Sequence, residues 1–246
     1  MQIYLYEDES CLGLRPINYF RHSAELEIGM TSIQEKWQAF GIQTLLLGRN
    51  HSVQVESSEN SIFILANVIP SYELCDTVRQ LEIGTALYQA ETLIAFKTLQ
   101  NLNFDQDLYL NTFSLSFKQK IQLSFLNDQL LFPWDIVRLN TKWLKIDSQK
   151  YESKVMPYEQ VAMLEPNNIT IGENVEILPF TCLNAKYGKI VIGNNVKIGA
   201  NCYLEGPLFL ADHTEIRAFT SIKDTSLHLY SRGGGEIASS VIYAYS

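Results

Sequence analysis

The sequence has few cysteines, and none of them are closely paired. Among its 246 residues are four cysteines, Cys11, Cys75, Cys182 and Cys202, and they form no C-x-x-C pair. Structural zinc sites and disulfide frameworks use cysteines at short, regular spacings. We therefore expect neither in this chain.

Long apolar runs and an excess of positive charge are also missing. No run is long enough to span a bilayer, and the first ten residues are acidic, unlike a leader peptide. Acidic residues outnumber basic ones by 27 to 19, which gives a formal net charge of −8. A general nucleic-acid binder needs a basic surface. We expect a cytoplasmic protein with neither a membrane nor a nucleic-acid partner.

Glycine-rich phosphate loops are absent as well. Neither G-x-G-x-x-G nor G-x-x-x-x-G-K-[ST] occurs. The glycine cluster GGGE at 233–236 is predicted to be a turn rather than a phosphate cradle.

What the chain does contain is a six-residue period between residues 171 and 226. Six is a multiple of two but drifts against a 3.6-residue helical turn, so it predicts short strands with one face repeated. Such hexads are typical of a parallel β-helix with three hexads per coil and the aliphatics inside. A sandwich of short strands with chance periodicity is the alternative. The aliphatics in register, with one slip around Tyr187 and Gly188, are Ile171, Ile177, Leu183, Ile192, Ile198, Leu204, Leu210, Ile216 and Ile222.

The residues directly after several of these aliphatics are glycine or asparagine. They are Gly172, Asn184, Gly193 and Gly199. Because these residue types tolerate a positive φ, we expect them to form the corners between strands.

The confinement of the repeat to the last third of the chain predicts two domains. We place an α/β domain at 1–147, a linker at 148–168 and the β-helix at 169–246. In the first domain, QIYLY, TLLLG and SIFILANVIP are predicted strands. The stretch 104–132 alternates and is predicted to be an antiparallel excursion.

Three helices are predicted in the first domain. Ser32 and Glu35 form a capping box before the first, and Ser71 is the expected N-cap of the second, which extends towards Gly84. The third begins at Pro133. The alternation of strand and helix favours a largely parallel, Rossmann-like sheet.

Four segments resemble a known family. They are LRPINYFRHSAELEIGMTSIQEKW, IFILANVIP, WDIVRLN and the tail GGGEIASSVIYAYS. In this order they are similar to segments of the bifunctional enzymes that make UDP-N-acetylglucosamine, in a divergent form found in some bacteria. That family joins a sugar-1-phosphate nucleotidyltransferase to a left-handed β-helix acetyltransferase. The resemblance implies the same two folds here.

The chain also departs from that family's pattern. Where the family has Thr-Arg-Pro, this chain keeps only the arginine, as Arg21. Glu27 stands where the family has a second arginine. Leu65 replaces an asparagine, and Asn67 replaces an arginine. The sequence stops at Ser246, where the family continues into a histidine-containing part of its acetyltransferase site, so we expect the acetyl-coenzyme A site to be incomplete.

The resemblance implies transfer of a nucleotidyl group to a sugar 1-phosphate, with a nucleoside triphosphate and Mg²⁺ as partners. Arg21 is the expected phosphate clamp, or else a surface arginine paired with Glu25. Asp8 follows the first strand, where α/β folds place ligands, although an acidic loop is the alternative. Asn67 is a further expected substrate contact.

Asp135 and Asn140 are the remaining candidates for contact with the sugar. Asp135 is also the candidate ligand of the metal. A first-turn carboxylate favoured by the helix dipole is the alternative for Asp135. His213 and His228 raise the question of an acyltransferase base. The place of His213 in the hexad predicts an outward, solvated side chain. His22 and His51 receive no role.

Three functions follow from these observations. The first is a sugar nucleotidyltransferase directed to UDP-N-acetylglucosamine. The second is a relative with decayed activity that acts as an assembly or regulatory module, and the third is a hexapeptide acyltransferase. By resemblance we expect a homotrimer packed along the β-helix.

Overall fold

The computed structural model describes most of the chain. No helix in this part is long and apolar enough to cross a membrane. The described residues are 2–48, 61–104, 109–155 and 158–246.

Two compact units make up the structure. Unit 1 consists of Met1–Leu26 and Ser32–Asp135, and unit 2 of Glu27–Thr31 and Ile136–Ser246. Each unit therefore contains two separate stretches of chain.

This division differs from the expected boundaries at 147 and 168. Most of the helix α3 (Pro133–Asp147) belongs to unit 2. Strand β9 (Ala162–Leu164) lies inside the expected linker and pairs in parallel with β12 (Cys182–Asn184). The polar composition of 148–168 concealed this strand. Two of its three residues are exposed and one is half-buried.

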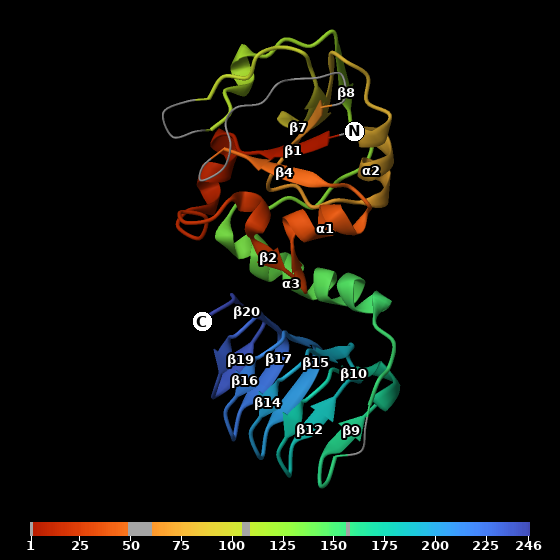
Figure 1. Cartoon of the computed structure of the whole chain (residues 1–246), viewed down its shortest axis with the longest axis vertical. Helices are drawn as coiled ribbons and strands as arrows, with labels where there is room; N and C mark the ends of the chain where they lie inside the picture. Colours follow the sequence, from red (N-terminus) through yellow and green to blue (C-terminus); the bar gives the residue numbers. More distant parts are fainter. Residues whose placement is uncertain (1, 49–60, 105–108, 156–157) are drawn as a thin grey trace. The chain divides into compact units, whose positions relative to one another are not determined.

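Unit 1 is built around a six-stranded sheet in the order β4-β1-β5-β7-β6-β8 (Figure 1). Strands β4, β1 and β5 are mutually parallel, whereas β7 is antiparallel to both of its neighbours. All five residues of β5 are buried, so both faces of the sheet are covered there. The strands are β1 Gln2–Tyr6, β4 Thr44–Leu47, β5 Ser61–Leu65, β6 Thr85–Gln89, β7 Thr92–Lys97 and β8 Gln119–Gln122.

The antiparallel part of the sheet is not where the sequence placed it. Strands β6 and β7 form an antiparallel hairpin, while β8, within the expected excursion, is parallel to β6. Within 104–132 the antiparallel contacts are isolated bridges, such as Phe104 with Leu110. The hairpin turn places Ala90 at φ 53°. It contains no Asn-Gly or Asp-Gly signal that would have identified it.

The predicted helices of unit 1 are confirmed. Helix α1 (Ile33–Ala39) begins with a complete capping box between Ser32 and Glu35. Trp37, fully buried in α1, donates from Nε1 to the carbonyl oxygen of Val68 at 3.1 Å.

The second helix, α2 (Tyr72–Arg79), has Ser71 as its N-cap and ends five residues before Gly84. The short remaining elements of the two units, outside the stacked strands of unit 2, are η1 Glu9–Leu14, η2 Ser23–Glu25, β2 Glu27–Ile28, β3 Thr31–Ser32, η3 Thr112–Ser114, η4 Ser148–Lys150 and η5 Pro166–Asn168.

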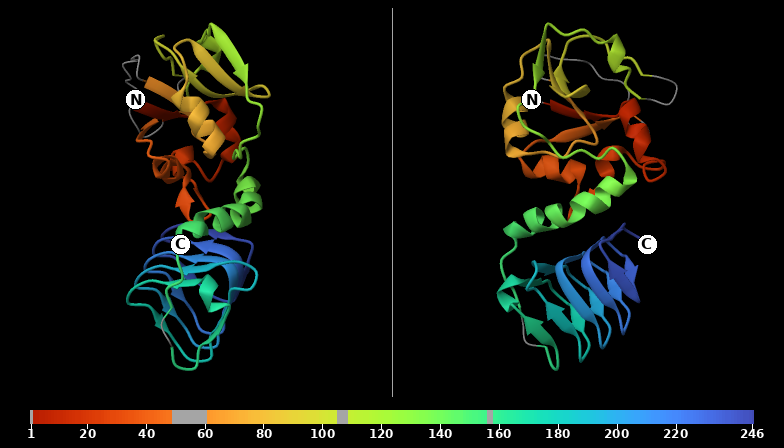
Figure 2. Two further views of the ribbon diagram at one scale, coloured as in Figure 1. Left: turned by 90° about the vertical axis from the view of Figure 1, so that its right-hand side faces the viewer. Right: turned by 180° about the vertical axis from the view of Figure 1, so that it is seen from behind.

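Unit 2 is a coil of short strands stacked in parallel, which Figure 2 shows as successive layers. Three stacks recur along it: β10-β13-β15-β17-β20, β11-β14-β16-β18 and β9-β12-β15-β17-β19. The bounds not yet given are β10 Ile169–Ile171, β11 Glu176–Ile177, β13 Ile190–Ile192, β14 Lys197–Ile198, β15 Tyr203–Leu210, β16 Glu215–Ile216, β17 Ser221–Leu227, β18 Arg232–Gly233, β19 Glu236–Ala238 and β20 Val241–Ile242.

The predicted interior of this coil is confirmed. All nine aliphatics of the hexad period are buried and belong to one hydrophobic cluster. Ile198 pairs with Ile216, and Leu204 with Ile222, so equivalent residues recur after three hexads. Because neighbouring strands of the coil pair in parallel, the alternative of an ordinary sandwich is wrong.

The expected role of the corner glycines is not what the structure shows. Gly172, Gly193 and Gly199 are not among the residues with positive φ. Glycine is needed at these positions because successive windings of the coil lie close together. A Cβ on Gly199 would collide with the backbone of Ala218. The left-handed corners are formed by larger residues, including Asn174, Asn195, His213, Tyr230 and Tyr245.

One outer face of the coil carries a column of alternating charge. Glu176 stands beside Lys197, Lys197 beside Glu215, and Glu215 beside Arg232. All four side chains are exposed, and Arg232 Nε lies 3.2 Å from Glu215 Oε2. Opposite charges on neighbouring strands favour this register.

Candidate active site

The carboxyl ends of the parallel strands of unit 1 carry several polar residues. Glu7 and Asp8 directly follow β1, and Asn67 follows β5, which pairs with β1 in parallel. Parallel strands bring such residues to one edge of a sheet, where open α/β folds bind ligands. The site is therefore built outward from the end of β1.

Glu7 is fully buried at this edge and anchors the loop that follows η1. Its Oε1 accepts hydrogen bonds from the backbone N–H of Ser23 at 2.9 Å and from the Ser23 hydroxyl at 2.5 Å. Its backbone carbonyl accepts the N–H of Leu110 at 2.7 Å. Glu7 thus connects three segments that are far apart in sequence, a role that its strand-end position did not reveal.

His22 lies beside Glu7 and is equally buried. Its Nδ1 accepts the backbone N–H of Ala24 at 3.3 Å, which places the imidazole proton on Nε2. Nε2 then faces the carbonyl oxygen of Leu47 at 3.3 Å and Glu7 Oε2 at 3.8 Å. This buried pair fixes the loop that contains Arg21.

Asp8 begins the short helix η1 and is 9% exposed. Its Oδ1 accepts the backbone N–H of Ser10 at 2.9 Å and the Ser10 hydroxyl at 2.5 Å. Burial raises the pKa of the Asp8 carboxyl above its usual value, although the Ser10 hydrogen bonds act in the opposite direction. The structure therefore holds a carboxylate in surroundings that disfavour its charge.

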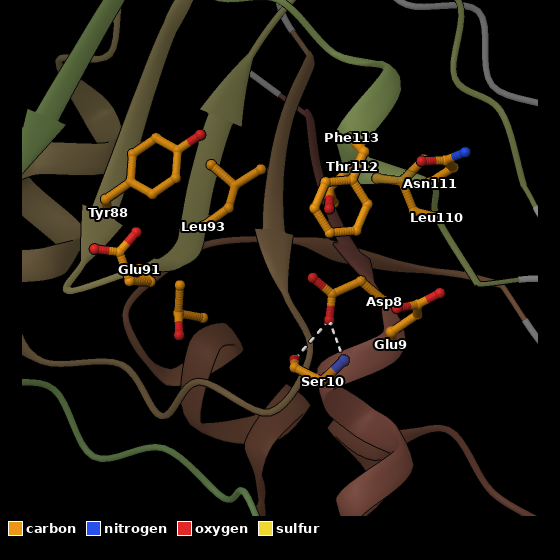
Figure 3. Close-up of a pocket in the computed structure, with 11 residues that line it drawn as sticks. Asp8, Glu9, Ser10, Tyr88, Glu91, Leu93, Leu110, Asn111, Thr112 and Phe113 are labelled. Atoms are coloured by element: carbon orange, nitrogen blue, oxygen red, sulfur yellow. Dashed lines mark hydrogen bonds between the residues drawn. The ribbon is translucent and has the colours of Figure 1, made fainter.

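The carboxylate of Asp8 faces a cavity of about 400 Å³. Figure 3 draws Asp8 with the loop side chains of Leu110–Phe113 on one side and the hairpin side chains Tyr88 and Leu93 on the other. The lining residues are Asp8, Glu9, Ser10, Tyr88, Glu91, Thr92, Leu93, Leu110, Asn111, Thr112 and Phe113.

Most of these lining residues escaped sequence reasoning. Glu91 and Thr92 lie at the turn of the β6–β7 hairpin, and Thr112 and Phe113 belong to η3. No periodic pattern connects these segments with the end of β1. The sequence carries no signal for them. Only the structure marks Phe113, an apolar side chain that is 90% exposed.

The cavity is acidic. Three of its lining residues are carboxylic acids, Asp8, Glu9 and Glu91, and none is Lys, Arg or His. The nearby thiol of Cys11 is fully buried, and its pKa is raised mainly by burial, so it remains protonated. Among the residues that the structure describes, no three His, Cys, Asp or Glu side chains come together as a metal site.

The other predicted residues of unit 1 lie outside this lining. Arg21 is partly buried at the bend before η2. Asn67 is fully buried, and its Oδ1 accepts a hydrogen bond from Gln129 Nε2 at 3.1 Å. Leu65, which replaces a family asparagine, is buried at the end of β5.

Asp135 lies in the first turn of α3. Its Oδ2 accepts the backbone N–H groups of Leu131 and Phe132 at 3.0 and 2.9 Å. These contacts fix the chain just before the helix begins.

Asn140 and Glu27 belong to unit 2. Asn140 is 1% exposed, and its Oδ1 accepts the backbone N–H of Gly29 at 2.8 Å and the Ser226 hydroxyl at 3.2 Å. Glu27 Oε1 lies 3.4 Å from Nδ1 of the buried His228. The structure thus brings Asn140 together with Glu27 and the coil, and places Asp8, Asn67, Arg21 and Asp135 in the other unit.

The histidines of the coil take no part in a described cavity. His213 is exposed at a left-handed corner and stacks on Tyr230, with ring centroids 4.5 Å apart, which confirms the outward orientation expected for it. His51 lies outside the described residues.

One comparison with known proteins covers nearly all of unit 1 and the first part of unit 2. A family model described as "Sugar nucleotidyl transferase" matches residues 3–155, which is more than half of the chain and contains the whole Asp8 cavity. No curated protein matches the chain. By the extent of the family match, the chain belongs to the sugar nucleotidyl transferase family.

Proposed function

We propose that this chain transfers a nucleotidyl group from a nucleoside triphosphate to a sugar 1-phosphate at the Asp8 cavity, releasing pyrophosphate. The single observation that carries this proposal is the position of Asp8. It follows the central parallel strand β1, and its buried carboxylate lines a cavity within the residues that match the family.

The acidity of the cavity determines what the reaction needs. Both substrates are phosphate anions, which the carboxylates of Asp8, Glu9 and Glu91 repel. A divalent cation between carboxylates and phosphates removes that repulsion. Mg²⁺ is typically bound by one or two carboxylates together with substrate phosphates and water. Asp8 and Glu9 therefore suit a Mg²⁺ that binds with its substrate rather than in a complete protein cage.

Each side chain has a proposed role in this scheme. Asp8 and Glu9 would hold Mg²⁺, whose charge stabilises the phosphate oxygens during the in-line displacement. Arg21 would clamp a phosphate with its forked guanidinium, since the neighbouring His22 and Glu7 fix its loop. Asn67 and Asp135 lie outside the cavity lining, and the family resemblance alone supports them as further substrate contacts and Asp135 as a further carboxylate for the metal.

The finer assignments follow the family resemblance. We propose uridylyl transfer to N-acetylglucosamine 1-phosphate as the specific reaction. We also propose that the coil of unit 2 is left-handed and packs against two further copies as a homotrimer. Supporting this, the coil has the three-hexad period of hexapeptide repeats.

Pyrophosphate release from nucleoside triphosphates in the presence of sugar 1-phosphates tests the function. UTP and dTTP are each combined with N-acetylglucosamine 1-phosphate and glucose 1-phosphate, with and without Mg²⁺. We expect release that requires both substrates and the metal. Asp8→Asn should lower kcat/KM at least a hundredfold, as expected for a residue that holds the catalytic charge.

Asp76→Asn is the matched control. Asp76 is an exposed carboxylate of α2 that pairs with Arg79, so its variant should retain full activity. If no combination releases pyrophosphate, and no nucleotide raises the melting temperature, the nucleotidyltransferase proposal is wrong. The decayed relative and the hexapeptide acyltransferase would then remain.

A further inference from the structure

The outer face of unit 2 has a notch at Gly234. Residues two apart in an extended chain share a face, so Glu215 and Arg217 both point outward, as do Arg232 and position 234. Strand β18 places Arg232 beside Glu215, which brings Gly234 beside Arg217. Because Gly234 has no side chain, the aliphatic stem of Arg217 can lie over this place in the outer face.

The stem of Arg217 runs along this notch. A Cβ built on Gly234 would meet Arg217 Cδ at 3.1 Å and Arg217 Cβ at 3.5 Å. The resulting cavity has a volume of about 390 Å³ and is lined by Arg217, Ala218, Arg232 and Gly233–Gly235. The glycines therefore expose backbone and leave room for the guanidinium groups.

The charge of this cavity is positive on a protein of net charge −8. Arg217 has no carboxylate partner among the residues that the structure describes. Arg232 uses Nε towards Glu215, which leaves its two terminal nitrogens for another acceptor. None of the lining residues is acidic.

We infer that this notch binds a phosphate group between Arg217 and Arg232. Each guanidinium presents two parallel donors that match two oxygens of one phosphate. The exposed glycine backbone lets the anion approach without steric conflict. The ligand class is inorganic phosphate or the terminal phosphate of a small phosphomonoester.

The inference does not depend on the proposed function. Every residue of the notch belongs to unit 2, whereas the Asp8 cavity belongs to unit 1. Variants of the notch should therefore change phosphate binding and leave pyrophosphate release unchanged.

Isothermal titration of the full chain at low salt tests the notch. The probes are inorganic phosphate, glucose 1-phosphate and UMP, which share the phosphate group and differ in what carries it. Arg217→Gln and Arg232→Gln should each weaken binding at least about tenfold, the loss expected for one charge-assisted hydrogen-bonding group. If the variants weaken binding of all three probes equally, inorganic phosphate alone is a sufficient ligand. If they weaken only the binding of UMP, the ligand is a nucleotide phosphate.

Gly234→Glu provides a second, independent variant. It fills the notch and adds a negative charge, so it should abolish the binding that Arg217→Gln weakens. Lys197→Gln is the control, because Lys197 is an exposed cation on the same face but does not line the notch. Circular dichroism confirms that each variant is folded. Binding at the Asp8 cavity should survive in the notch variants. The inference is therefore overturned if no probe shows binding that both Arg217→Gln and Gly234→Glu weaken.

Discussion

Replacing Asn140 by alanine should destabilise unit 2. Asn140 is 1% exposed, and its Oδ1 accepts the Gly29 N–H at 2.8 Å and the Ser226 hydroxyl at 3.2 Å. The alanine removes both acceptor contacts at once. The Gly29 N–H is then left in a buried place without its acceptor.

The expected loss follows from these two contacts. A buried donor that loses its acceptor costs about 1–3 kcal/mol, and a net hydrogen bond to a hydroxyl contributes about 1 kcal/mol. We expect Asn140→Ala to lower the free energy of unfolding by about 2–4 kcal/mol. Ser226→Ala leaves the Gly29 contact intact and should cost about 1 kcal/mol.

Urea denaturation and amide hydrogen exchange measure these effects. The exchange rate of the Gly29 amide should rise in Asn140→Ala and stay nearly unchanged in Ser226→Ala. A double-mutant cycle between the two positions should give a coupling of about 1 kcal/mol. The reasoning is refuted if Asn140→Ala costs less than about 0.5 kcal/mol and leaves exchange at Gly29 unchanged. A change in KM without any loss of stability would instead favour direct contact with substrate.

Three further predictions concern other parts of the chain. Asp8→Asn should raise the urea midpoint at pH 7 and change it less at pH 4, because burial raises the pKa of the Asp8 carboxyl and only its ionised form is penalised. Leu204→Ala, deep in the coil, should lower the free energy of unfolding by about 2–5 kcal/mol, and a loss below about 1 kcal/mol contradicts its interior role. Ser71→Ala should cost about 1 kcal/mol by removing the N-cap of α2, and Ser71→Asp should restore most of it in the same urea assay, whereas equal losses would refute the cap.

The local features of the fold were readable from the sequence because their causes are local. The hexad aliphatics recur at a fixed period, so Ile198 and Leu204 could be placed inside the coil before any contact was known. Ser32 and Ser71 predict helix starts, because the side chain of an N-cap serine accepts a backbone N–H only three residues further along the chain. Each of these signals is complete within one turn or one strand.

The candidate site was only partly readable, because its contacts connect distant segments. Asp8 could be proposed from its place after β1, but Glu91 and Phe113 reach the same cavity through a hairpin and a loop without any sequence period. The partners of Asn140 were hidden for the same reason, since Gly29 and Ser226 lie far from it in the chain. Such pairings arise from tertiary packing, which overrides local preference.

The charge column on the coil limits how this unit can change in length. Its signs alternate from one winding to the next, through Glu176, Lys197, Glu215 and Arg232. Removing the single winding that carries Lys197 would set two glutamates against each other, whereas removing two windings together would keep unlike neighbours adjacent. Shortening or lengthening of the coil should therefore be tolerated best in even numbers of windings.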